Sequence, residues 1–141
     1  MLIKFKSKRS NIMKKILFLT ISMLLSGNVF AATDHYVLRD DGYVRHLKVT
    51  QIAGEYTVSA DVDYEASAKD HCSSDISSKA KSTGKDELLM KKHSESEASF
   101  CELKIKLSPN GAKIEESKDC DNFTIGHCHF SSDGKELIKV K

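Results

Sequence analysis

One eleven-residue segment, Glu55–Glu65, alternates apolar and polar residues without interruption. Its apolar residues are Tyr56, Val58, Ala60, Val62 and Tyr64. Because successive side chains of a β-strand point to opposite faces, this period of two predicts a strand with one face on a core and the other in water. Residues 100–108 repeat the pattern, with Cys101, Leu103, Ile105 and Leu107 on the apolar face. The chain therefore contains at least two strands of the antiparallel type.

Glycine-containing turns divide the remaining chain into further short strands. Weaker alternation marks residues 43–51, 112–116, 123–130 and 136–140, and in the first of these Tyr43, Leu47 and Val49 share one face. The turns are Asp41-Gly42, Ala53-Gly54, Pro109-Asn110-Gly111 and Asp133-Gly134, and we expect a positive φ at each glycine. Short strands separated by such turns predict an all-β fold, a small antiparallel β-sandwich or barrel built as a meander.

The segment 66–99 fits two patterns. Cys72, Ile76 and Ala80 would share one face of a helix, yet they also alternate with serines as in a strand. Helix-starting residues are poor here, so we predict a strand over 71–81, a turn at Thr83-Gly84 and a second strand over 87–92. One short helix is the alternative.

Residues 13–32 carry the parts of a secretory signal peptide in the right order. Lys14 and Lys15 precede an apolar run over 16–25, and small residues stand at positions −3 and −1 of a cleavage site after Ala31. We expect residues 1–31 to be removed, with Met13 as an alternative start, and residues 32–141 to form one secreted domain. The run is shorter than the roughly 20 residues that span a bilayer. We therefore expect a periplasmic protein without a membrane anchor.

Removal of this leader reverses the net charge of the chain. All 20 acidic residues follow Ala31, whereas six of the 22 basic residues precede it, which leaves 16 basic residues and a net charge of −4. Nucleic-acid binding needs a basic surface that displaces counterions from phosphates, so we expect no nucleic-acid partner. A mildly acidic surface suits a basic protein partner.

All four cysteines lie in the predicted mature domain, and an oxidising compartment favours their pairing as disulfides. Four cysteines allow three connectivities. We expect Cys72 to pair with Cys101, which would tie the ambiguous segment to a strong strand. Cys120 would then pair with Cys128 and close a short loop. The crossed pairings remain open at this stage.

A metal site is the rival interpretation of these cysteines, because His71-Cys72 and His127-Cys128-His129 place soft ligands side by side. In a strand, however, the two histidines of the triplet would face away from Cys128, and the C-x2-C spacing of tetrahedral zinc sites is absent. We expect no metal and no cofactor. The chain also lacks G-x-S-x-G, H-E-x-x-H and a glycine-rich phosphate loop, so we expect no enzyme activity.

The order of cysteines and turns from residue 72 onward resembles a known group of proteins. The sequence runs Cys72-x3-Ile76-x3-Ala80, a Leu-Leu-Met strand, Cys101-x-Leu103-x-Ile105, Cys120, Gly126, Cys128 and Phe130-x2-Asp133-Gly134. This pattern is similar to small secreted β-proteins of Gram-negative bacteria, among them lysozyme-inhibitor-like proteins and periplasmic immunity proteins that block peptidoglycan-degrading effectors of type VI secretion. The chain lacks the Ser-Gly-x-x-Tyr segment of inhibitors of vertebrate-type lysozymes, which favours an immunity protein.

The resemblance implies a protein that binds and occludes the active site of a lysozyme-like peptidoglycan hydrolase. Acidic side chains would meet basic groups that line the polysaccharide cleft. The candidates for these contacts are Glu115, Glu116, Asp119, Asp121, Asp40 and Asp41. The alternative is a periplasmic carrier or envelope-stress protein that binds a small ligand or a metal. An exposed edge strand would also permit a homodimer.

Overall fold

Eight antiparallel strands, connected in chain order, form a closed barrel in the computed structural model, which describes residues 31–96 and 98–141. The strands are β1 (Ala31–Asp40), β2 (Tyr43–Ile52), β3 (Glu55–Glu65), β4 (His71–Gly84), β5 (Glu87–His93), β6 (Phe100–Leu107), β7 (Gly111–Glu116) and β8 (Leu137–Val140). A short 3-10 helix, η1 (Lys118–Phe123), follows β7. The predicted leader lies outside the described residues, except for Ala31, which begins β1.

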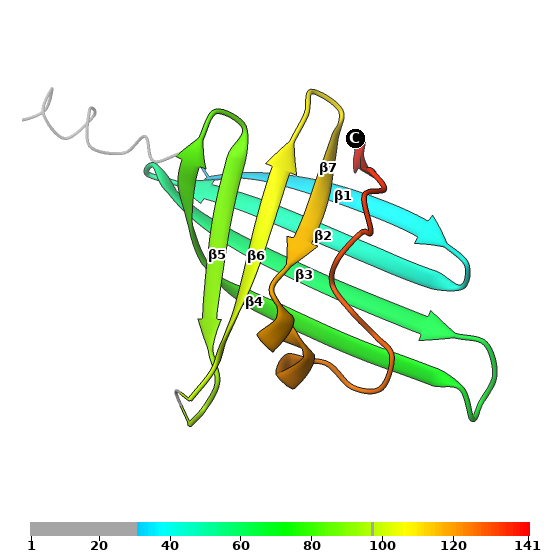
Figure 1. Ribbon diagram of the computed structural model, residues 1–141. Coiled ribbons are helices and arrows are strands. Elements are labelled where there is room, and N and C mark those ends of the chain that lie inside the picture. The colour runs from blue at the N-terminus through cyan, green and yellow to red at the C-terminus, as the bar shows by residue number, and fades with distance from the viewer. Residues whose placement is uncertain (1–30, 97) are drawn as a thin grey trace, which may run out of the picture. The chain divides into compact units, whose positions relative to one another are not determined.

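Each strand pairs with its neighbours in sequence, and β8 closes the barrel by pairing with both β7 and β1. The strands β1 to β4 are long and extend as two hairpins beyond the shorter strands β5 to β8, as Figure 1 shows. The predicted all-β antiparallel meander is confirmed, in the form of a barrel rather than a sandwich.

The alternation of the two strong strands places their apolar side chains inside the barrel, as predicted. Val58 and Val62 of β3 and Leu103 and Ile105 of β6 are each fully buried. Burial of one such side chain contributes about 1.5–3 kcal/mol relative to leaving it exposed. Tyr56 and Tyr64, at the two ends of the β3 pattern, are only partly buried against the core.

The sequence analysis did not predict β1, which pairs along its whole length with β2. Its inner face contributes one fully enclosed side chain, Tyr36, whereas Asp34 and Asp40 are half-buried polar residues on the same face. Val37 interrupts the alternation because it lies on the outer face between two apolar neighbours. Pairing with β2 and β8, rather than a two-residue period, fixes this strand.

The segment 66–99 forms the two predicted strands, β4 and β5, and the alternative of a helix there is wrong. The turn between them lies at Lys85-Asp86 rather than at Thr83-Gly84, and Asp86 has a positive φ of 61°. A register shift between Ser82 and Gly84 accounts for the difference, because it carries β4 past the predicted turn.

The predicted strand over 123–130 is wrong. Beyond η1 this stretch is an irregular connection that passes through Gly126 at a φ of 62°. Two of its backbone N–H groups find side-chain acceptors instead of a neighbouring strand. Ile125 N–H donates to Ser74 Oγ over 3.2 Å, and Phe130 N–H donates to Glu116 Oε2 over 3.3 Å.

Both expected disulfide pairings are wrong, since the bonds are Cys72–Cys128 and Cys101–Cys120. β5 lies between β4 and β6 in the sheet order, so Cys72 and Cys101 belong to strands that are two positions apart. Two strand spacings amount to about 9.5 Å, which exceeds the roughly 7 Å that a disulfide can span between Cα atoms. Cys101 instead meets Cys120 of η1, at a Cα separation of 4.4 Å.

The predicted turn conformation is confirmed at Gly42, Gly54 and Gly134, where φ lies between 80° and 84°. It is wrong at Gly111, which has no positive φ and begins β7. A side chain at this position would collide with the carboxyl group of Glu136. Close packing, rather than backbone conformation, therefore accounts for this glycine.

Candidate functional site

The meander places its connections at the two ends of the barrel in turn. We name the end that carries the β1–β2, β3–β4, β5–β6 and β7–β8 connections the loop end, and the opposite end the turn end. The β2–β3, β4–β5 and β6–β7 connections of the turn end are tight. The β7–β8 connection is much longer and contains η1. The loop end therefore presents most of the irregular chain among the described residues.

Charge separates along the barrel in the same direction. The acidic residues at or beside the loop end are Asp40, Asp41, Glu65, Asp70, Glu95, Glu116, Asp119, Asp121 and Asp133. The basic residues there are Arg39, Arg45, Lys69, Lys92, Lys118 and Lys135. Lysines outnumber carboxylates at the turn end, where Lys79, Lys81, Lys85, Lys106, Lys113, Lys139 and Lys141 lie near Asp34, Glu55, Asp86, Glu87 and Glu136. An acidic end and a basic end orient the protein in the field of a charged partner.

Of the six acidic candidates, Asp41, Asp119 and Asp121 are exposed at the loop end. Asp41 lies in the β1–β2 turn, and the other two lie on η1. Asp40, beside Asp41, forms an ion pair with Lys135 of the β7–β8 connection. The β1–β2 turn and the long connection thus lie next to each other.

The two glutamates of β7 have different surroundings. Glu115 is on the outer wall of the barrel and pairs with Lys106 of β6 at 3.1 Å. Glu116 is half-buried and accepts backbone N–H groups of Phe130 and Ser131, each over 3.3 Å. Burial raises the pKa of Glu116, and the two backbone donors oppose this shift. Glu116 thus holds the β7–β8 connection in place, and Glu115 lies apart from the other candidates.

A cluster of aromatic and histidine rings that the sequence analysis did not single out occupies the loop end. His127 Nδ1 lies 2.7 Å from the hydroxyl of Tyr43, and its Nε2 lies 3.0 Å from Asp70 Oδ1. The hydroxyl donates to Nδ1 when Nε2–H donates to the carboxylate, so one neutral tautomer satisfies both contacts. The ring of Tyr64 packs against both Tyr43, at a centroid distance of 4.5 Å, and His127, at 4.6 Å. We name Tyr43, Tyr64 and His127 the ring cluster.

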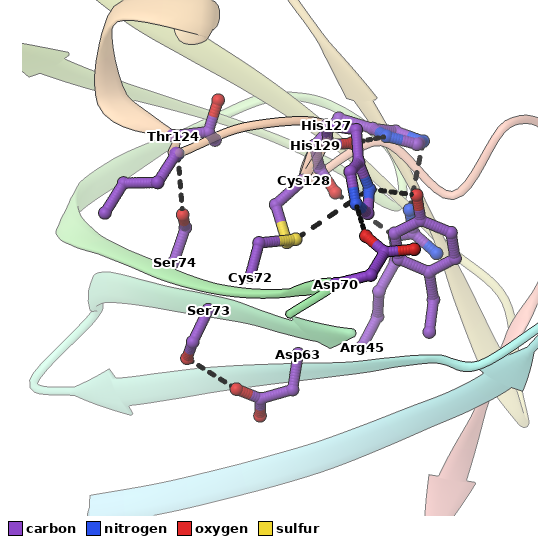
Figure 2. The surroundings of a disulfide bond; sticks show 12 residues. Arg45, Asp63, Asp70, Cys72, Ser73, Ser74, Thr124, His127, Cys128 and His129 are labelled. Carbon is purple, nitrogen blue, oxygen red and sulfur yellow. Dashed lines mark hydrogen bonds and ion pairs between the residues drawn. A yellow bond between two sulfur atoms is a disulfide. The ribbon is translucent and has the colours of Figure 1, made fainter. Parts of the chain in front are cut away.

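The Cys72–Cys128 disulfide fixes the ring cluster to the barrel. It joins the first residues of β4 to the β7–β8 connection next to His127 (Figure 2). The same view shows Asp70 directed toward His127, from the loop that precedes β4. The ring positions are therefore set by a covalent bond, a hydrogen bond to Tyr43 and a contact with Asp70, although much of this surface is exposed.

A buried arginine lies below the ring cluster. Arg45 belongs to the inner face of β2, is 3% exposed and places its guanidinium 4.8 Å from the centre of the Tyr43 ring. Its Nε donates to the backbone carbonyl of His129 over 3.3 Å. Burial lowers the pKa of Arg45, and the surrounding acidic groups, Asp133 first among them, oppose this shift. Arginine keeps its charge in proteins, so the loop end contains a fixed internal cation.

His129 lies between this cation and a carboxylate. Its Nε2 is 3.0 Å from Arg45 Nη2 and 2.8 Å from Asp133 Oδ2. One ring nitrogen cannot accept from arginine and donate to aspartate at once, so the position of the imidazole proton decides which contact is a hydrogen bond. The hydrogen bond from His129 holds the pKa of Asp133 below its usual range.

One sequence signal could have located this site. Strict alternation from Tyr43 through Leu47 to Val49 assigns Arg45 to the same inner face. A cation on an otherwise apolar face requires buried acceptors, which in this protein lie in the β7–β8 connection. The parts of the ring cluster, by contrast, come from β2, β3 and a distant connection, and no local pattern joins them.

Comparisons of the chain with protein-family models, curated proteins and solved structures give no match. Among residues 31–96 and 98–141, no helix has the length and apolar character needed to cross a membrane. The same residues contain no group of three or more His, Cys, Asp or Glu side chains already arranged to hold a metal ion.

Proposed function

We propose that this protein is a periplasmic immunity protein, which binds and occludes the catalytic cleft of a lysozyme-like peptidoglycan hydrolase. The observation that carries the proposal is the composition of the loop end, where acidic side chains outnumber basic ones and Asp70 contacts the ring cluster through His127. Protein interfaces typically combine a few aromatic residues that carry most of the affinity with a polar rim. Tyrosine is favoured at such positions because its rigid ring buries a large area at low entropic cost.

The shape and charge of the loop end support binding to a basic cleft. The β1–β2 and β3–β4 hairpins extend beyond the shorter strands (Figure 1), so a rigid projection is available to enter a groove. Exposed Asp41 and Asp70 lie on these hairpins. In this proposal the carboxylates accelerate encounter with the basic cleft, and the rings then carry the affinity. Two disulfides suit an oxidising compartment such as the periplasm.

An immunity gene is expected directly beside the gene for its toxin, so the test begins with a search for a peptidoglycan hydrolase encoded there, and the lack of one would contradict the proposal. The oxidised domain is mixed with the hydrolase, and the rate of cell-wall digestion and the dissociation constant are measured. We expect a stoichiometric complex that stops digestion. Failure to form a complex with the neighbouring hydrolase, or formation of a complex that leaves digestion unchanged, would contradict the proposal.

Variants at the two barrel ends locate the contact surface. Tyr64→Ala removes one ring of the cluster and should weaken binding by about 30-fold or more, since loss of a central aromatic residue costs about 2 kcal/mol or more. Asp41→Asn should mainly slow association and reduce its dependence on salt. Lys81→Ala, at the turn end, is the matched control and should bind like the unaltered protein. Loss of binding in the control alone would place the interface elsewhere.

A further inference from the structure

The outer wall of the barrel carries a histidine pair. His35 of β1 and His46 of β2 place Nε2 and Nδ1 only 2.9 Å apart. Their rings are stacked, with centroids 5.2 Å apart and an interplanar angle of 24°. Both side chains are partly buried and stand on strands that pair continuously over ten positions. The sheet therefore holds the two imidazoles together without help from any loop.

The 2.9 Å contact is a hydrogen bond between the two imidazoles, and it shows that the two nitrogens can approach as closely as neighbouring ligands on a metal ion. Imidazole nitrogen binds such ions at about 2.0 Å, so two nitrogens in adjacent positions of a square-planar ion lie about 2.8–2.9 Å apart. A shared ion requires the two rings to turn about their Cβ–Cγ bonds, which have broad torsional minima. The required change is a rotation of side chains, because the pairing of β1 with β2 already holds the two residues side by side.

A carboxylate beside the pair provides a second, independent indication. Asp61 of β3 is the direct partner of His46 in the sheet register. The Oδ1 atom of Asp61 is buried, and it has no hydrogen-bond partner among the described residues. An unpaired buried carboxylate oxygen is costly, and a cation nearby would offset this cost. Asp75 of β4 continues the same row and adds a second negative charge.

We propose that His35 and His46 form a two-nitrogen site for a divalent copper ion, with water as the remaining ligands. Asp61 would not bind the ion directly, and its negative charge would stabilise the bound cation. Three side chains do not already converge here, which is why water is part of the proposed coordination. Copper is favoured because Cu²⁺ binds imidazole nitrogen more tightly than Zn²⁺ or Ni²⁺ does. This site is on the barrel wall and does not depend on the proposed binding of a hydrolase.

The experiment titrates the oxidised protein with Cu²⁺ and follows binding by calorimetry and electron paramagnetic resonance. We expect one tightly bound ion with hyperfine coupling to two nitrogens. His46→Ala and His35→Gln should each weaken binding at least 30-fold and remove the two-nitrogen signal, and two different substitutions guard against a folding defect in either. Asp61→Asn should weaken binding several-fold and keep the two-nitrogen signal.

His93→Ala is the matched control, since His93 is an exposed strand histidine that packs on Phe100 instead of another histidine. It should bind copper like the unaltered protein. A His127→Ala variant tests the other histidines of the fold. Loss of tight binding in His127→Ala with retention in His46→Ala would overturn the inference. Equal affinity of the unaltered protein and His46→Ala would do the same.

Discussion

The two disulfides are nested in the sequence, and this arrangement allows their contributions to stability to be estimated separately. Cys72–Cys128 spans 56 residues and encloses Cys101–Cys120, which spans 19. If a disulfide acts by restricting the unfolded chain, loops of these lengths correspond to about 4 and 3 kcal/mol at 25 °C. The inner bond shortens the outer loop to roughly 38 free residues, which lowers the larger value by only about 0.3 kcal/mol. Both values are large against a total stability of about 5–15 kcal/mol.

The assay is equilibrium unfolding in urea, without reductant, of the paired variants Cys72→Ala/Cys128→Ala and Cys101→Ala/Cys120→Ala. We expect losses of about 4 and 3 kcal/mol, and a steeper urea dependence in both because the unfolded chain expands when a crosslink is removed. Both cysteines of the inner pair are fully buried, so their replacement also leaves a small cavity that adds to its loss. Peptide mapping of the unaltered protein checks the connectivity. Losses below about 1 kcal/mol, or a peptide linking Cys72 to Cys101, would refute this reasoning.

Two further predictions concern a glycine and a carboxylate. Gly111→Ala should destabilise the protein by about 2 kcal/mol through collision with Glu136, and Gly111→Ala/Glu136→Ala should recover most of this loss in urea unfolding. Gly54→Ala, where the added methyl group meets open space, should lose only about 1 kcal/mol from its positive φ, and equal losses in both single variants would contradict the collision. The lowered pKa of Asp133 means that its contact with His129 stabilises the fold above the usual aspartate range and is lost as the pH falls through the lowered pKa. Asp133→Asn should therefore show a smaller decline of unfolding free energy below about pH 4, measured by urea unfolding across pH, and an unchanged decline would count against this pairing.

The sequence predicted those parts of the fold in which local alternation and burial agree. β3 and β6 each place a complete apolar face in the core, so the period of two is uninterrupted. The sequence analysis did not predict β1, because pairing with the neighbouring strand, rather than the composition of β1 itself, determines its structure. The stretch 123–130 was predicted as a strand from its weak alternation, although one disulfide, Cys72–Cys128, and side-chain acceptors hold it in place of a ladder.

The candidate site was predicted only as a distribution of charge. Acidic residues near Asp41 and Asp121 do gather at one end of the barrel, since an even number of strands separates their connections. The ring cluster depends on the disulfide partner of Cys72, and sequence spacing alone could not choose among three pairings. The expected Cys120–Cys128 bond would have left His127 without a tether to β4.

The packing of the barrel explains why the proposed binding surface lies at its end. Eight strands enclose an interior just wide enough for side chains. Here the large residues Leu47, Met90 and Phe130 fill that interior and are almost fully buried. At the loop end, Arg45 ends this apolar filling of the interior. Its buried charge requires hydrogen-bond acceptors, and the β7–β8 connection supplies one in the backbone carbonyl of His129. The same connection presents His127 to solvent, so the residues that complete the core also build the exposed ring cluster. A substitution at Arg45 should therefore disturb stability and partner binding together, whereas Asp41→Asn, in an exposed turn, should change binding with little loss of stability.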